Sequence, residues 1–163
     1  MDNISLIENK ILPLEKLFPF LNIWRFKDQK IVFTNGCFDL LHLGHIDYLA
    51  KAADMGNKLV IGLNSDSSTA TLKGSGRPIT NQISRANLLA SLFFVDAVVI
   101  FNEATPYELI KAIKPDVLVK GADYTIDKIV GSDIVLSNGG EVKTIEYIDG
   151  YSTSAIEQKI RNS

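Results

Sequence analysis

The densest group of reactive side chains in this 163-residue sequence lies between Thr34 and His45. It contains the only two histidines of the chain, His42 and His45, three residues apart. At the start of a helix, side chains at this spacing project to the same side. The free backbone N–H groups and the dipole of a helix start attract an anion. The stretch therefore predicts a phosphate site at which two imidazoles stabilise charge during phosphoryl or nucleotidyl transfer.

The neighbouring residues favour this interpretation over two alternatives. Gly36 allows a tight turn after a short β-rich run, and Gly44 leaves room beside the histidines for a ligand. A zinc site is disfavoured, because the sequence has no third histidine and only one cysteine, Cys37. Two histidines that merely cap or pack would not need a glycine between them directly after a strand and its turn.

Two later segments carry groups suited to a nucleotide. In the segment 120–124, Gly121 allows close approach, Asp123 can accept a hydrogen bond from a ribose hydroxyl or an amine, and Tyr124 offers a stacking face. An Asx-type turn with a half-buried tyrosine is the alternative there. The segment 152–154 supplies three hydroxyls before the last expected helix. An N-cap needs only one, so a second anion site is predicted.

Hydrophobic periodicity predicts the elements that position these residues. Strands are expected at 31–34, 59–63, 97–101, 117–119 and 141–148. Helices are expected at about 42–55, 84–93, 105–114 and 152–161, the third with a capping box from Thr105 to Glu108. Apolar strands that alternate with helices predict an α/β fold, a Rossmann-like doubly wound parallel sheet with helices on both faces. Ligands of such sheets bind at the carboxyl ends of the strands.

Composition and charge narrow the class of protein. With 46% hydrophobic and 22% charged residues, the chain is expected to fold as one globular domain at 27–163, with a helical preamble at 1–26 packed on it. The net charge of −2 gives no reason to expect binding to nucleic acid. No apolar run reaches the roughly 18–20 residues that span a bilayer, and no signal peptide is recognisable. We therefore expect a cytoplasmic protein without membrane contact, which the single cysteine also favours.

Gly-x-Phe-Asp at 36–39, followed by His-x-Gly-His at 42–45, resembles the H-x-G-H signature of the nucleotidyltransferase superfamily. The similarity covers most of the chain, and it is greatest for the adenylyltransferases that make ADP-heptose. It implies that a sugar 1-phosphate, D-glycero-β-D-manno-heptose 1-phosphate, attacks the α-phosphate of ATP and releases pyrophosphate. It also implies Mg²⁺ bound through the ATP phosphates, with Asp39 as the one candidate side-chain ligand.

The same resemblance assigns roles to individual residues. Catalytic roles fall to His42, His45 and Lys73. Nucleotide binding is assigned to Thr34, Asn35, Gly36, Cys37, Phe38, Gly44, Lys120, Gly121, Asp123, Tyr124, Ser152, Thr153 and Ser154. Substrate binding is assigned to Asp39, Asn64, Asp66 and Arg77. The polar stretch 64–81 is expected to be a loop. For Lys73 on this loop, a solvated surface charge is as well supported as a catalytic role. Arg85 is expected to pair within the fold.

Two other functions remain open. A cytidylyltransferase for glycerol 3-phosphate or another polyol phosphate would share the first signature. Those enzymes carry an arginine shortly before the glycine of their second signature, where this chain has Tyr147-Ile148-Asp149 before Gly150. A non-catalytic nucleotide-binding domain would not need the histidine pair, Lys73 and the hydroxyl-rich last helix together. The short chain predicts a stand-alone adenylyltransferase, and a homodimer is left open.

Overall fold

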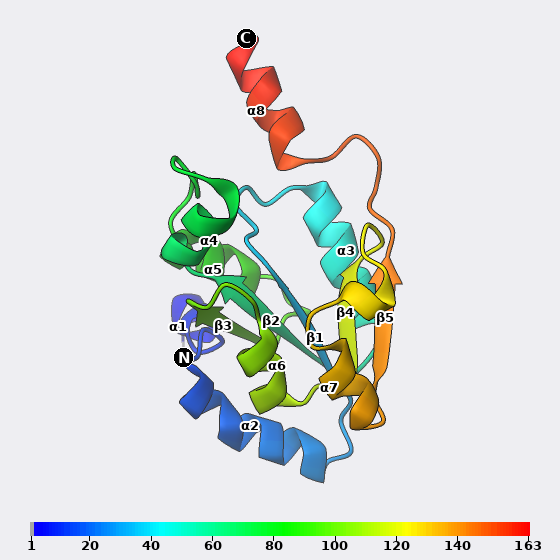
Figure 1. Cartoon of the computed structure of the whole chain (residues 1–163). Helices are drawn as coiled ribbons and strands as arrows, with labels where there is room; N and C mark the ends of the chain where they lie inside the picture. Colours follow the sequence, from blue (N-terminus) through cyan, green and yellow to red (C-terminus); the bar gives the residue numbers. More distant parts are fainter. Residues whose placement is uncertain (1) are drawn as a thin grey trace.

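The computed structural model describes residues 2–163, in which one sheet of five parallel strands has the order β3-β2-β1-β4-β5 (Figure 1). The strands are β1 (Ile31–Gly36), β2 (Lys58–Asn64), β3 (Ala97–Phe101), β4 (Val117–Gly121) and β5 (Glu141–Ile145). From β1 the chain first builds outward through β2 and β3, and then adds β4 and β5 on the opposite side of β1. The expected Rossmann-like, doubly wound sheet is therefore confirmed.

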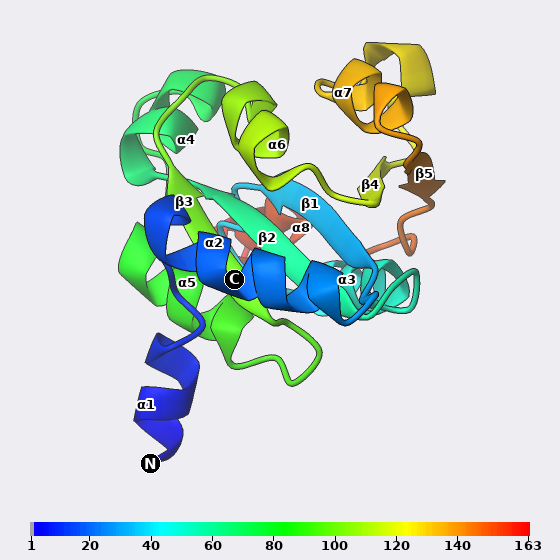
Figure 2. The ribbon, with the colours of Figure 1, turned by 90° about the horizontal axis from the view of Figure 1, so that it is seen from below.

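Helices cover both faces of this sheet. They are α1 (Asn3–Glu8), α2 (Leu14–Phe26), α3 (Leu43–Ala53), α4 (Asp66–Lys73), α5 (Gln82–Ala90), α6 (Tyr107–Ile113), α7 (Ser132–Ser137) and α8 (Thr153–Arg161), with a 3₁₀ turn, η1 (Ile126–Lys128). Figure 2 shows α6 and α7 on one side of the strands and α3 and α5 on the other. In the described chain, no helix is long and apolar enough to cross a membrane.

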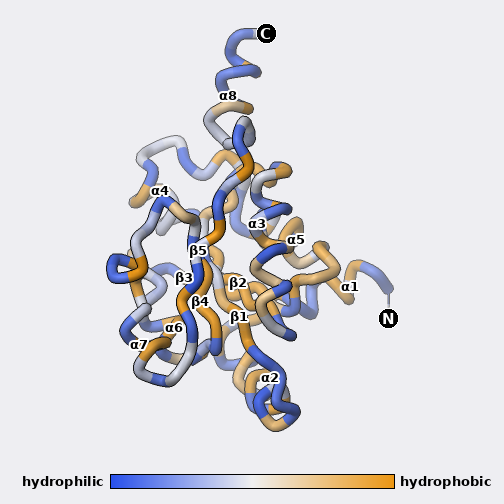
Figure 3. The backbone as a smooth tube through the Cα atoms, turned by 90° about the vertical axis from the view of Figure 1, so that its right-hand side faces the viewer, coloured by the Kyte–Doolittle hydropathy of each residue, from blue (hydrophilic) through white to orange (hydrophobic). Residues whose placement is uncertain are grey.

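Alternate residues of the strands enter different halves of the core. In β1, Ile31 and Phe33 pack in a cluster with α2 and α6, whereas Val32 between them packs with α3 and α5. Burial on both faces explains why β1 to β4 are largely apolar runs in the sequence, coloured mostly orange in Figure 3, whereas in the edge strand β5 only Val142 and Ile145 are buried. Packing on both sides therefore holds the ends of the strands in place and determines where the loops that follow them begin.

The N-terminal segment contributes to this core through α2. Leu17 and Leu21 are fully buried and Trp24 is nearly so, all in the cluster that contains Phe33. Pro13 occupies the cap position of α2, while Pro19 lies inside the helix, which continues past it.

Two local expectations from the sequence are wrong. The stretch 64–81 is not all loop, because Ser65 caps α4 by accepting a hydrogen bond from the Ser68 backbone N–H at 3.2 Å. The capping box at Thr105 does not form. Helix α6 begins one residue later than the box requires, with Pro106 at the cap position and its carbonyl accepting from Ile110 N–H.

The boundaries of other elements shift slightly. Strand β5 ends at Ile145 instead of continuing to 148, and α3 begins at Leu43 with His42 as its cap residue. The segment that follows β5 leaves the sheet and runs to α8 (Figure 1). This departure places residues 147–154 at the carboxyl end of the sheet.

Candidate active site

A cavity of about 690 Å³ opens at the carboxyl ends of β1 and β4. These two strands are neighbours at the point where the direction of winding reverses, which is where doubly wound sheets bind their ligands. The start of α3 and the start of α8 contribute to its walls, and the end of α4 reaches it with Leu72 and Lys73. Among the described residues, none of the segment 102–106, which connects β3 to α6, lines the cavity.

Most of the residues that the sequence assigned to a site meet in this cavity. Its predicted lining residues are Asn35, Gly36, Cys37, Phe38, His42, His45, Asn64, Lys73, Lys120, Gly121, Asp123, Tyr124, Ser152, Thr153 and Ser154. The assigned residues that do not line it are Thr34, Asp39, Gly44, Asp66 and Arg77. Its lining residues without a sequence-based role are Tyr48, Leu72, Tyr147 and Tyr151.

The two histidines form a stacked pair at the start of α3. Their ring centroids are 3.8 Å apart and their planes are inclined by 22°. Burial lowers the pKa of His42, and burial together with the neighbouring His42 lowers the pKa of His45 to about 4. Both rings are therefore neutral at neutral pH in the free protein, and they act as N–H donors to an incoming ligand until its negative charge raises their pKa.

Three buried polar atoms around these rings lack a hydrogen-bond partner within residues 2–163. They are the Nδ1 atoms of His42 and His45 and the Oδ1 atom of Asn35. Buried polar groups in native proteins are almost always satisfied. All three residues line the same cavity, but the three atoms themselves are turned into the protein and not toward the cavity.

The cavity is bounded by two helix starts. His42 is the cap residue of α3, but its side chain makes no capping hydrogen bond, so the imidazole remains available. Ser152 caps α8 by accepting from Ala155 N–H at 3.1 Å. Two anion-attracting helix ends therefore serve one cavity. They approach each other at Gly44, where a Cβ would lie 3.1 Å from the His42 ring and 3.3 Å from Cβ of Tyr151.

Lys120 supplies a positive charge from the end of β4. Its Nζ lies 3.4 Å from the carbonyl oxygen of Asn35 and 5.6 Å from the centre of the Tyr124 ring. Burial lowers the pKa of Lys120 to about 8, an effect that Asp123 partly opposes. The ammonium group thus stays charged at neutral pH while being poorly hydrated, which strengthens its attraction for a phosphate.

An aromatic wall stands beside Lys120. Tyr147 stacks on Tyr48 with ring centroids 5.7 Å apart, and the Tyr48 hydroxyl shares a 2.8 Å hydrogen bond with Oγ1 of Thr34. A Cβ at position 121 would overlap the Tyr147 ring and hydroxyl, so only glycine fits there. Thr34 therefore does not line the cavity itself but holds the hydroxyl of Tyr48, which does. No local pattern in the sequence indicates that Tyr147 lines the cavity, because its position depends on where β5 ends.

Asp39 and Arg77 brace the loop between α4 and α5. Oδ1 of Asp39 accepts from the backbone N–H groups of Ile79 at 2.8 Å and Thr80 at 3.1 Å, and Oδ2 accepts from Arg77 at 3.1 Å. Burial alone would raise the pKa of Asp39, but these hydrogen bonds outweigh it and lower the pKa. Arg77 also donates to Glu157 of α8.

Arg85 is fully buried under the cavity, as the expectation of pairing within the fold requires. Its Nη1 donates to the carbonyl oxygens of Cys37 at 2.6 Å and Asn64 at 2.8 Å, and its Nη2 donates to Asp66 at 2.7 Å. One guanidinium thus ties the loop after β1 to the end of β2. Asp66 is engaged by this contact and lies outside the cavity lining.

No metal centre is built from the side chains of the described residues, because no group of three His, Cys, Asp or Glu residues gathers there. Both carboxylate oxygens of Asp39 are occupied by protein donors. Asp123 is the one carboxylate among the residues lining the cavity. The donor set therefore does not fit a metal ion held by protein ligands alone.

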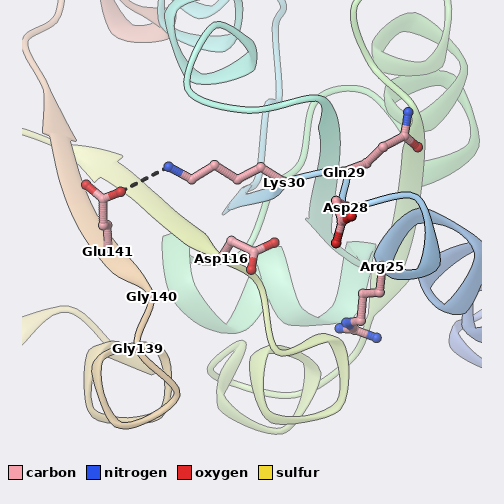
Figure 4. A pocket seen from close by; sticks show the side chains of 8 residues that line it. All are labelled: Arg25, Asp28, Gln29, Lys30, Asp116, Gly139, Gly140 and Glu141. Atoms are coloured by element: carbon pink, nitrogen blue, oxygen red, sulfur yellow. Dashed lines mark hydrogen bonds and ion pairs between the residues drawn. The ribbon is translucent and has the colours of Figure 1, made fainter.

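A second hollow, of about 390 Å³, lies near the amino ends of β1, β4 and β5 (Figure 4). Four of its five charged side chains, those of Arg25, Lys30, Asp116 and Glu141, have partners within the protein. Lys30 pairs with Glu141 at 3.0 Å, Asp116 accepts from Ile31 N–H at 2.7 Å, and Arg25 donates to the Ile113 carbonyl. These pairings leave little reason for an ionic ligand to bind there.

Comparison with known proteins gives a consistent result. The sequence model of a family described as cytidylyltransferase-like matches residues 33–159. The bifunctional protein HldE of Paramagnetospirillum magneticum is 52% identical over 162 residues, or 99% of this chain. HldE of Helicobacter pylori (strain J99) is 53% identical over 167 residues, or 100% of this chain. These alignments cover only 33% and 35% of the two relatives, so the chain spans about one third of their length.

A solved structure supports the same grouping. The crystal structure of a lipopolysaccharide core biosynthesis protein from Thermoplasma volcanium GSS1 is 30% identical and superimposes with a TM-score of 0.59. The match covers 76% of this chain and 99% of that protein. The arrangement of strands described above therefore belongs to a fold that a similar protein has in a crystal.

Proposed function

Because the chain belongs to the cytidylyltransferase-like family of nucleotidyltransferases, we propose that it is an ATP-dependent sugar-phosphate adenylyltransferase. The substrate we propose is D-glycero-β-D-manno-heptose 1-phosphate. One of its phosphate oxygens attacks the α-phosphorus of ATP, the bond to the β-phosphate breaks, and ADP-heptose and pyrophosphate are formed. No covalent enzyme intermediate is needed, because the phosphate oxygen is already a nucleophile.

One observation carries this proposal: the starts of two helices and the stacked rings of His42 and His45 meet at a single cavity of about 690 Å³. That volume lies within the usual range for small-molecule sites. The choice of a heptose substrate is supported by the similarity to HldE over essentially the whole chain and by the lipopolysaccharide core role in the name of the Thermoplasma volcanium protein. The absence of a basic residue at 147–149 supports ATP over CTP.

His42 and His45 are assigned to the transferring phosphate. As neutral rings they donate N–H groups to the phosphate oxygens, and their pKa rises as negative charge develops on the five-coordinate phosphorus. Lys73, at the end of α4, is assigned to the leaving pyrophosphate, with Ser152, Thr153 and Ser154 at the opposite helix start. Catalysis then consists of orientation and charge stabilisation by groups already in place.

The aromatic lining residues and Asp123 are assigned to the nucleoside. Tyr124 and the Tyr147–Tyr48 stack offer flat surfaces for the base, and Asp123 can accept a hydrogen bond from a ribose hydroxyl. Asn35 and the backbone of 36–38 form the floor on which the α-phosphate rests. Thr34, Asp39, Asp66 and Arg77 are proposed to act indirectly, by holding these lining residues.

Enzymes of the nucleotidyltransferase family typically use a divalent metal ion. We propose that Mg²⁺ arrives bound to the ATP phosphates, where it neutralises part of their charge, since the protein offers no cluster of ligands of its own. An ATP-dependent reaction also implies a cytoplasmic location, with which the free, buried thiol of Cys37 accords.

The test is a pyrophosphate-release assay with Mg²⁺, either ATP or CTP, and a panel of sugar and polyol phosphates. We expect release with ATP and heptose 1-phosphate, and much less with glucose 1-phosphate or glycerol 3-phosphate. A preference for CTP with a polyol phosphate would replace the proposal by a cytidylyltransferase. No release with any pair, despite measurable ATP binding, would indicate a binding domain.

A further inference from the structure

Helix α8 has little that holds it in place. None of its residues is buried, and Figure 1 shows it at the end of an extended segment, standing apart from the sheet. Within residues 2–163, the only hydrogen bond or ion pair between the segment 150–163 and the rest of the chain joins Glu157 to Arg77. A helix of nine residues is marginal in water by itself. The position of α8 therefore depends strongly on this one contact.

In the ion pair with Glu157, Arg77 is itself held in place by a second ion pair. Its second amino group donates to Asp39, whose side chain is only 1% exposed. Asp39 in turn holds the backbone of Ile79 and Thr80. Three charged side chains thus connect the loop after β1, the loop between α4 and α5, and α8. The side chains of Arg77 and Glu157 are 23% and 21% exposed, so solvent screens their attraction only in part.

The contact lies one turn beyond the residues of α8 that line the cavity. Ser152, Thr153 and Ser154 are at the start of the helix, and Glu157 follows three residues after Ser154. If α8 swings away, these hydroxyls and the free N–H groups of the helix start leave the cavity with it. If α8 is fixed, they form its wall.

We propose that Glu157 is a positioning residue: through Arg77 it holds α8 so that the 152–154 turn faces the triphosphate of the nucleotide. The assignment of ATP to that turn rests on the proposed function. Arg77 then serves as a strut between Asp39 and Glu157, and it is not itself a ligand of the substrate phosphate. Arg77, the partner of Glu157, does not line the cavity, so the effect of Glu157 is expected on the nucleotide at the 152–154 turn.

The direct test compares Glu157→Gln with Lys159→Gln. Both remove one charge from α8 with little change in helix propensity, but Lys159 is exposed and makes no ion pair within residues 2–163. We expect Glu157→Gln to raise KM for ATP about three- to tenfold, with kcat and KM for the sugar phosphate changed less than twofold. Lys159→Gln should match the wild type. An unchanged Tm would show that the effect is not a loss of folding.

A second measurement does not depend on catalysis. Hydrogen exchange of the amides in 153–161, measured on the free protein, should become faster in Glu157→Gln and stay the same in Lys159→Gln. Equal exchange in all three proteins would overturn the proposal, whatever the assays show. Faster exchange in a protein that releases no pyrophosphate would retain the positioning role and reject the proposed function, so the two failures are distinguishable.

The direction of the change in KM for the sugar phosphate distinguishes two roles of Arg77: positioning of α8, or direct binding of the substrate phosphate. If Arg77 is a phosphate ligand that Glu157 keeps occupied, then Glu157→Gln would free it and lower KM for the sugar phosphate. That outcome would contradict the proposal. If Glu157 acts through Arg77, the double variant Arg77→Gln/Glu157→Gln should have the same KM for ATP as Arg77→Gln alone. Additive effects of the two substitutions would contradict it as well.

Discussion

The imidazole rings of His42 and His45 stack at 3.8 Å, and both rings have a lowered pKa. This arrangement is unfavourable for a cation on either ring, because a proton on one repels a proton on the other and burial disfavours both. The pair is thus poised to gain positive charge only when a phosphate enters the cavity. Because protonation of these rings is unfavourable in the folded chain, the free energy of unfolding of the free protein should depend on pH.

The stability of the free protein should fall as the pH is lowered from about 6.5 toward 4. The pKa of His45 is about 4 in the folded chain, below the value of about 6.5 in an unfolded one, so the unfolded state binds more protons in this window. After allowance for solvent screening, we expect a loss of about 1 kcal/mol in the free energy of unfolding between pH 7 and pH 5. Urea titrations at the two pH values measure it.

The matched variant for this titration is His45→Asn. Because the chain has only two histidines, most of the difference between the two pH values should disappear when His45 is replaced. An equal loss of stability in wild type and variant would assign the pH dependence to other groups and reject the lowered pKa.

Removal of either histidine should abolish most of the turnover. By analogy with the loss of one oxyanion donor, His42→Ala or His45→Ala should lower kcat at least about a hundredfold. Binding of ATP should change much less, because Lys120 and the helix starts remain. Initial rates of pyrophosphate release and a parallel ATP titration separate the two effects. Turnover near that of wild type in both variants would sink the proposed mechanism.

Gly121 should tolerate no side chain while Tyr147 is present. A Cβ at 121 would overlap the Tyr147 ring, so Gly121→Ala should cost about 1–3 kcal/mol of stability and weaken ATP binding. The partner variant Tyr147→Ala removes the obstacle. In the double variant, the alanine at 121 should add little to the effect of Tyr147→Ala, as thermal or urea unfolding can show. If Gly121→Ala is equally costly in both backgrounds, the overlap is not the cause.

The sequence predicted the parts of the site that depend on local signals. A strand followed by Gly36 and two histidines at helical spacing places a helix start at the edge of a parallel sheet, and the structure has this arrangement. The hydroxyl-rich start of α8 follows the same logic, since Ser152 alone serves as the cap. Such features are encoded within a few residues and need no knowledge of distant neighbours.

The parts that failed depend on contacts between distant residues. Nothing near Glu157 indicates that it meets Arg77, which is 80 residues away in the chain. Tyr147 enters the cavity because β5 ends at Ile145, three residues earlier than its apolar pattern suggested. Helix α4 is a different case, because its start is a local signal: Ser65 is followed by Asp66, and a serine with an acidic residue after it is a usual helix start. The expectation of a loop at 64–81 rests on polar composition alone.

Arg85 should be essential for folding rather than for chemistry. It is fully buried, and it joins three carbonyl groups, those of Cys37, Asn64 and Thr80, to Asp66 below the cavity. Replacing it with methionine leaves those acceptors unpaired, which should lower the free energy of unfolding by about 3–5 kcal/mol. The exposed Arg161→Met is the control, with an expected change below about 0.5 kcal/mol. A small effect of Arg85→Met would mean that water replaces the guanidinium.

The lowered pKa of Lys120 should appear in the pH dependence of ATP binding. Burial brings this pKa to about 8, so in the free protein the ammonium group loses its proton as the pH rises through that value. ATP phosphates favour the charged form, and binding above pH 8 must therefore recover the lost proton. The Kd for ATP should rise by up to about tenfold per pH unit between pH 8 and pH 9.5, as calorimetric titrations can measure.

Two variants serve as controls for this rise in Kd. Lys120→Arg stays charged and should give a flat profile, whereas Lys73→Gln should keep the rise. A wild-type Kd that is constant up to pH 9.5 would contradict a contact between Lys120 and the phosphates, because such a contact must raise the pKa of Lys120 and so link its proton to ATP affinity.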